Sequence, residues 1–118
     1  MQIEIEPKTD HLYAVISGPF DHAKLEGVLK EIFTTGSRHG LRKVLIDIKA
    51  LEGEIPVMAR HDAGEIAASF RTEVIRLAIL GTETQIWPDR FFENVANNRG
   101  LATKVTTDLA EALEWLRK

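Results

Sequence analysis

The sequence predicts an α/β fold built on a mostly parallel sheet. Two stretches, 42–48 and 73–81, are nearly continuous apolar runs, which is typical of central strands covered on both faces. Segments with helical spacing alternate with these runs, and such alternation indicates parallel strands joined by right-handed helical crossovers. We therefore predict a single domain over residues 1–118 with the order β-β-α-β-α-β-α-β-α, a five-stranded sheet with four helices.

The first two predicted strands form an antiparallel hairpin. "QIEIE" (2–6) alternates apolar and polar residues, as a half-exposed edge strand does, and "PKTD" turns the chain into "HLYAVISG" (11–18). A helix follows from about Asp21 and ends near Gly40, which can take the left-handed capping conformation. Its apolar stripe consists of Leu25, Val28, Leu29, Ile32 and Phe33.

The second half of the chain continues the alternation. We predict a second helix from about Val57 to Phe70 and a third from about Pro88 to Asn97 or Asn98. A short strand, 101–106, and a last helix capped by Asp108 complete the fold. The residues expected to face inward are Ala59, Ala63, Ile66, Ala67 and Phe70 on the second helix, despite Gly64, and Leu109, Ala112, Leu113 and Leu116 on the last.

Composition restricts the function. The net charge of −3 argues against a nucleic-acid partner, because phosphate binding needs a basic face. The absence of cysteine excludes disulfides and zinc–thiolate sites and fits a reducing compartment. The first residues lack a secretory-signal pattern, and the longest apolar stretch is too short to cross a membrane. We expect a cytoplasmic protein without a transmembrane segment, and peripheral membrane contact stays open.

No strong catalytic or metal signature is present. His61 and Glu65 share one helical face, but "HDAGE" lacks the second histidine of the zincin pattern, so we interpret the pair as a polar surface contact. No glycine-rich phosphate or dinucleotide motif occurs, and no nucleophile lies beside the carboxylates. We predict no catalytic residue, no metal and no cofactor; an enzyme that uses Glu52 and Glu54 is the least favoured hypothesis.

Candidate binding residues gather at one end of the predicted sheet. Parallel strands place their C-terminal ends along the same edge, and ligands of open α/β sheets usually bind there. This topology predicts a site that draws on Ser17, Asp47, Lys49, Glu52, Glu54, Thr82 and Trp87.

An aromatic stripe lies in "QIWPDRFFENVANNRG" (85–100). Trp87, Phe91 and Val95 recur at four-residue spacing with Phe92 beside them, and a stripe of this kind usually belongs to the core. The alternative is that these aromatic residues line an apolar pocket or form a lid that touches a partner or a membrane. Phe91 and Phe92 therefore join the tentative ligand-binding residues.

Three strings together resemble the SpoIIAA-like family, relatives of the STAS domains of sulphate transporters and anti-sigma-factor antagonists. They are "KVLIDIKALEGEIP", "VIRLAILG" and "TDLAEALEWL", and the resemblance spans about residues 3 to 117. It implies a mostly parallel sheet wound with helices, and a regulatory or ligand-binding role. The related CRAL-TRIO domains hold lipids in an apolar pocket, which implies a second possible function.

The loop after the strand at 42–48 departs from the resemblance. Anti-sigma antagonists place an Asp there, followed by a Ser that is phosphorylated at a helix start, and Asp47 stands in the matching place. The following "IKALEGEIPVM" contains no Ser, Thr or Tyr, so it offers no phosphate acceptor. We interpret Glu52 and Glu54 as solvated loop carboxylates, with imitation of a permanent phosphate charge as the alternative.

These observations favour two functions. The first is a non-enzymatic regulatory domain that binds a protein partner, and the second is a carrier or sensor of a small apolar, lipid-like ligand. A homodimer is also expected: crossovers in chain order would put every helix on one face, while the strands look apolar on both. Either the first segment or a second copy of the chain would cover the other face.

Overall fold

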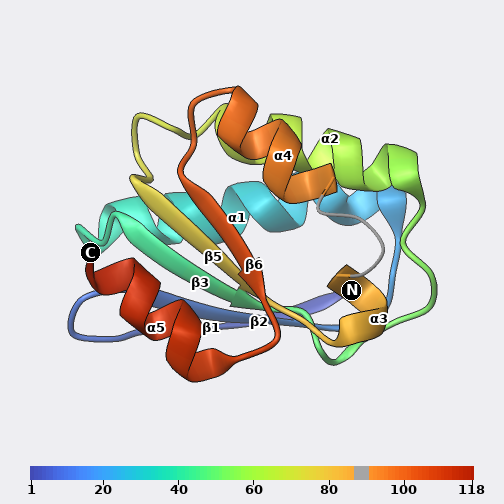
Figure 1. Ribbon diagram of the computed structural model, residues 1–118, viewed down its shortest axis with the longest axis horizontal. Coiled ribbons are helices and arrows are strands. Elements are labelled where there is room, and N and C mark those ends of the chain that lie inside the picture. The colour runs from blue at the N-terminus through green and yellow to red at the C-terminus, as the bar shows by residue number, and fades with distance from the viewer. Residues whose placement is uncertain (87–90) are drawn as a thin grey trace.

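The computed structural model describes residues 1–86 and 91–118, which form a six-stranded sheet with helices on both faces (Figure 1). The strands are β1 (Gln2–Pro7), β2 (Leu12–Pro19), β3 (Lys43–Asp47), β4 (Leu51–Glu52), β5 (Arg76–Leu80) and β6 (Thr103–Thr106). The helices are α1 (Leu25–Arg38), α2 (Val57–Ala68), α3 (Glu83–Ile86), α4 (Phe91–Asn98) and α5 (Leu109–Arg117), and a 3-10 turn, η1 (His22–Lys24), precedes α1.

The strand order β1-β2-β3-β5-β6 follows the chain, and only β1 and β2 pair antiparallel. This confirms the predicted mostly parallel α/β fold. The structure adds two short elements. β4 has two residues and pairs with the end of β2, opposite Gly18 and Pro19. α3 is a single turn that precedes α4, and Pro88, the predicted start of that helix, lies outside the described residues.

Local sequence explains where the helices begin. The Asp21 carboxylate accepts a hydrogen bond of 3.0 Å from the Ala23 amide, so the first helical segment starts where it was predicted, as a 3-10 turn. Asp108 caps α5 in the same way, at 2.9 Å from the Ala110 amide. Gly40, with φ of +69°, ends the first helical segment in the left-handed conformation that a side chain would strain.

The two faces of the sheet are covered by different helices (Figure 1). Strand alternation turns Val44 and Ile46 toward the core under α1 and α2, while Leu45 joins a second cluster under α5. The expectation that every helix lies on one face is therefore wrong. No strand follows α5, so α5 is not a crossover and the handedness rule does not decide which face it covers. Because α5 covers the second face, an uncovered sheet face no longer supports self-association, which stays a prediction.

The helix α5 differs from its predicted packing at one position. Ala112 and Leu116 are buried against the sheet, but Leu109 is 47% exposed. Leu109 lies in the first turn, and the helix becomes buried only from Ala112 onward. At the other end, the Arg76 guanidinium lies 5.0 Å from the Trp115 ring centroid, which keeps this tryptophan partly covered.

The side chains of α4 protect the free edge of β6. Asn97 bonds the Thr103 backbone twice at 2.9 Å, donating to its carbonyl and accepting from its amide. The Glu93 carboxylate accepts from the Val105 amide at 2.6 Å. These contacts satisfy backbone groups that an edge strand would otherwise offer to another chain. β6 is therefore poorly suited to extend the sheet into a second molecule.

Candidate functional site

Asp47 ends β3, and its side chain is only 13% exposed. Its Oδ1 accepts a 2.9 Å hydrogen bond from the Lys49 amide, and its Oδ2 lies 3.4 Å from the Tyr13 hydroxyl and 3.8 Å from Lys49 Nζ. Burial, together with the Asp47 charge, raises the pKa of the Tyr13 hydroxyl, which therefore stays protonated and able to donate. Asp47 thus shapes the turn that leads into the loop before α2.

A glutamine from α3 holds this loop in place. Gln85 Nε2 donates to the Ile48 carbonyl at 2.7 Å and contacts the Leu51 carbonyl at 3.4 Å. Its Oε1 accepts from the Thr82 amide at 2.9 Å, so both ends of the side-chain amide are used. The first half of the loop, 48–52, is therefore attached to the segment that follows β5.

Arg60 of α2 attaches the second half of the loop. Its Nε donates to the Ile55 carbonyl at 3.1 Å, and its Nη1 donates to the Gln85 carbonyl. The loop is thus held at both ends by side chains from two neighbouring elements. A loop anchored in this way presents its side chains in one arrangement, which reduces the entropy lost on binding.

Exposed apolar side chains stand where this loop enters α2. Pro56 occupies the N-cap and offers no side-chain hydrogen bond, and Val57 and Met58 are 57% and 63% exposed. Glu52 and Glu54, both exposed, precede them in the chain. We call these four residues, Glu52, Glu54, Val57 and Met58, the α2 N-terminal surface. Adjacent exposed apolar residues with a polar rim are a common feature of protein contact sites.

An apolar cavity of about 100 Å³ lies beneath α2, on the face of the sheet that α1 also covers. Ligand pockets for drug-sized molecules are typically about 300–1,000 Å³, so this cavity suits a guest of only a few heavy atoms. Arg60, Gln85 and Glu93 are its polar lining residues. Apolar lining comes from the sheet and four helices, and includes Ile16, Ile46, Ile79, Leu25, Leu29, Ala63, Ile86 and Phe92.

The predicted site residues separate into two groups on opposite faces. Asp47 and Lys49 contact each other on the face that carries Leu45, whereas Phe92 lines the cavity on the other face. Ser17 lies half-buried at the end of β2, opposite Gln2. The eight of these residues that the structure describes therefore do not form one pocket.

The remaining predicted residues have separate positions. Thr82 accepts a hydrogen bond of 3.3 Å from the Gln85 amide and so starts α3. The Phe91 ring lies 5.8 Å from the His61 ring, outside the cavity lining. Glu52 and Glu54 are on the loop surface, and Trp87 lies outside the described residues. Sequence reasoning missed Arg60 and Gln85, because no local pattern marks residues that bind a distant backbone.

No protein-family model and no curated protein matches the sequence. Its fold matches the crystal structure of an anti-sigma factor antagonist from Mycobacterium paratuberculosis, with a TM-score of 0.65 and 13% sequence identity. The match covers 99% of this chain and 94% of that chain. It confirms the SpoIIAA-like, STAS-type fold and gives no support to a CRAL-TRIO kinship. Separately, no helix among residues 1–86 and 91–118 has the length and apolar character needed to span a membrane.

Proposed function

We propose that this protein is a non-enzymatic regulatory domain that binds another protein through the α2 N-terminal surface. The observation that carries this proposal is the exposed Val57–Met58 pair on a loop anchored by Gln85 and Arg60. The fold match supports a protein-binding role, since the matched structure is that of an anti-sigma factor antagonist. At 13% identity, that support concerns the type of domain and not the partner.

Phosphorylation of the β3–α2 loop is not part of the proposed mechanism. Residues 48–58 contain no hydroxyl, and the helix start that follows the loop is capped by Pro56. Glu52 and Glu54 keep this surface negatively charged at neutral pH without any modification. We infer that the surface is constitutively able to bind, and that its partner presents an apolar recess with basic residues at its rim.

Catalysis is the weaker explanation of the acidic loop. Glu52 and Glu54 are exposed, whereas general acids and bases work in clefts that bring them within hydrogen-bond reach of a substrate. Asp47 already accepts the Lys49 amide and lies beside Tyr13. These contacts support a structural task for Asp47 and leave the loop without a paired acid and base.

Substitution of Met58 by lysine is expected to weaken partner binding about tenfold or more. Removal of one well-placed apolar anchor from an interface costs on the order of 1–2 kcal/mol, and 1.4 kcal/mol is tenfold in affinity. The partner would be captured from native extract with the wild-type protein and then titrated against each variant. Ile75→Lys is the matched control, because Ile75 is also exposed, at 43%, but lies at the N-terminal ends of β3 and β5, whereas the loop follows the C-terminal end of β3. Equal affinities of both variants would contradict the proposed surface.

The apolar cavity supports a second candidate function, the binding of a small apolar molecule. An engineered apolar cavity of about 150 Å³ can hold benzene, so a cavity of about 100 Å³ limits the guest to a comparable or smaller molecule. We therefore expect native mass spectrometry of the gently purified protein to show no adduct of several hundred daltons. Such an adduct, lost on denaturation, would contradict this size limit and favour a lipid-like ligand.

A further inference from the structure

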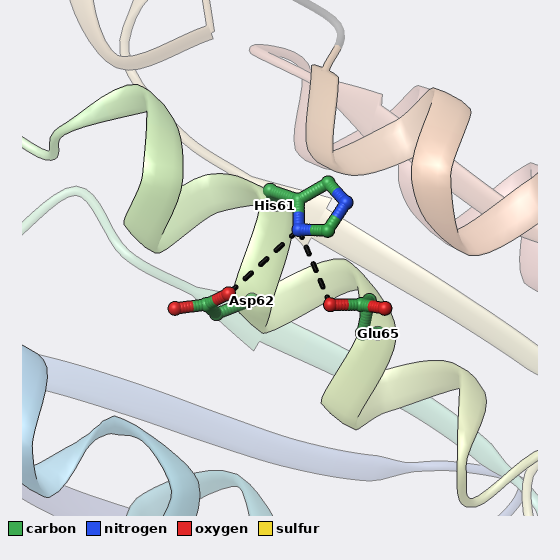
Figure 2. A group of neighbouring side chains, drawn as sticks. All are labelled: His61, Asp62 and Glu65. Atoms are coloured by element: carbon green, nitrogen blue, oxygen red, sulfur yellow. Dashed lines mark ion pairs between the residues drawn. The ribbon is translucent and has the colours of Figure 1, made fainter.

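Three potential metal ligands converge on one side of α2, as Figure 2 shows. His61 Nδ1 lies 3.2 Å from Glu65 Oε1 and 3.7 Å from Asp62 Oδ1. The three donor atoms all lie within 4.8 Å of one another. Residues three or four apart on a helix are neighbours, so Glu65 lies beside both His61 and Asp62. One nitrogen and two oxygens therefore surround a common point.

Each carboxylate in this group is held from outside by a basic side chain. Asp62 directs Oδ1 toward His61, and its Oδ2 lies 2.9 Å from His22 Nε2 of η1. Glu65 directs Oε1 toward His61, and its Oε2 lies 2.9 Å from Arg99 Nη2. Outer partners of this kind orient the ligands of metal sites and leave the inner oxygens available.

Among residues 1–86 and 91–118, His61 Nδ1 has no hydrogen-bond partner, although it is shielded from solvent. A buried polar atom without a partner costs free energy, and such atoms are uncommon in folded proteins. The two nearby carboxylate oxygens approach it without hydrogen-bond geometry. The Phe91 ring packs against the imidazole and holds its orientation. A cation at the common point would satisfy all three donor atoms at once.

We propose that His61, Asp62 and Glu65 form a binding site for a divalent transition-metal ion, with Zn²⁺ as the best-suited probe. Zinc bonds to His and carboxylate ligands are about 2.0–2.2 Å long, which places tetrahedral donors roughly 3.3 Å apart. The observed 3.2 Å between His61 Nδ1 and Glu65 Oε1 matches this spacing, and a small rotation of Asp62 brings its oxygen within range. Mg²⁺ and Ca²⁺ prefer all-oxygen sites, so the imidazole selects against them.

The charges around the site are compatible with a divalent ion. Asp62 and Glu65 contribute two negative charges, and the positive charge of Arg99 offsets one of them. The part of the chain that the structure describes supplies three ligands, all on the surface helix α2, and a fourth tetrahedral position is available to water. The bound ion would join α2 to η1 and to the turn just after α4 through the outer partners His22 and Arg99. This proposal does not depend on the α2 N-terminal surface.

Zn²⁺ titration of the untagged protein tests the site. At a free Zn²⁺ concentration a hundredfold above its Kd, the midpoint of thermal unfolding is expected to rise by about 10 °C, while Mg²⁺ at the same concentration leaves it unchanged. Isothermal calorimetry is expected to give one Zn²⁺ per chain. Saturable binding of more ions, or equal responses to Zn²⁺ and Mg²⁺, would overturn the proposal.

Substitutions of single residues test whether Zn²⁺ binds at these three side chains. Glu65→Gln and His61→Gln keep the side-chain size close to the original, and each is expected to weaken Zn²⁺ binding at least tenfold. His39→Gln is the matched control, because His39 is an exposed histidine at the end of α1, outside the group. Circular dichroism without metal checks that each variant is folded. Unchanged Zn²⁺ affinity in folded Glu65→Gln would show that the three side chains form only an ion-pair cluster.

Discussion

Replacement of Gly64 by leucine is expected to destabilise the protein by about 2–3 kcal/mol, although glycine is normally a poor helix residue. A Cβ built at Gly64 would lie 2.8 Å from both Cβ and Cγ1 of Val95 and 3.2 Å from the Phe92 carbonyl oxygen. These atoms belong to α4, and the Val95 Cβ and the carbonyl cannot move without the helix backbone. The larger side chain would therefore force α2 and α4 apart.

Alanine at the same position distinguishes packing from helix propensity. Propensity alone predicts that Gly64→Ala stabilises by about 1 kcal/mol, whereas the contact with Val95 predicts a net loss of about 1 kcal/mol. Gly27→Ala is the matched control: Gly27 lies inside α1, is exposed, and a Cβ there would meet nothing within 4 Å. We expect Gly27→Ala to stabilise by about 0.5–1 kcal/mol. Urea unfolding of both variants measures the difference, and a gain at Gly64 equal to that at Gly27 would contradict close α2–α4 packing.

Substitution of Leu116 by alanine is expected to cost about 2–4 kcal/mol of stability. Leu116 is 2% exposed and belongs to the cluster that α5 forms with Leu45, Ala78 and Leu80 of the sheet. The loss combines the transfer free energy of the deleted carbons with the cavity they leave. Denaturant unfolding measures it directly.

Leu109→Ala is the control within the same helix. Leu109 is 47% exposed, so its truncation is expected to change the free energy of unfolding by no more than about 0.5 kcal/mol. A similar loss in both variants would mean that α5 does not cover the second face as described. Analytical ultracentrifugation of Leu116→Ala adds a second measurement, because loosening of α5 uncovers apolar strand residues and should promote association with increasing concentration.

The candidate site shows where local sequence patterns stop being informative. Asp47 was predicted at the end of a central strand, and it lies there in contact with Lys49. A strand end is recognisable from a few neighbouring residues. Arg60 and Gln85 hold the same loop by bonds to backbone carbonyls, and Gln85 lies 37 residues from Ile48. Nothing near Gln85 in the chain indicates that contact.

The residues around His61 also divide into a contact visible in the sequence and contacts that only the structure shows. The i,i+4 pair of His61 and Glu65 is visible in the sequence, and its contact is present at 3.2 Å. His22 lies 40 residues from Asp62, and Arg99 reaches Glu65 from beyond the end of α4. These outer partners changed the interpretation, since they orient the carboxylates of Asp62 and Glu65 so that, with His61, three donor atoms converge.

The sequence by itself determined the alternation of strands and helices, the mostly parallel sheet, the start of the first helical segment near Asp21, and the cap at Asp108. These features depend on hydrophobic periodicity and hydrogen bonds between residues a few positions apart. Only the tertiary structure decided which face α5 covers, why Gly64 stands inside a helix, and which residues anchor the loop before α2. Each of these depends on atoms that are distant in the chain and meet only after the sheet has formed, so no local pattern encodes them.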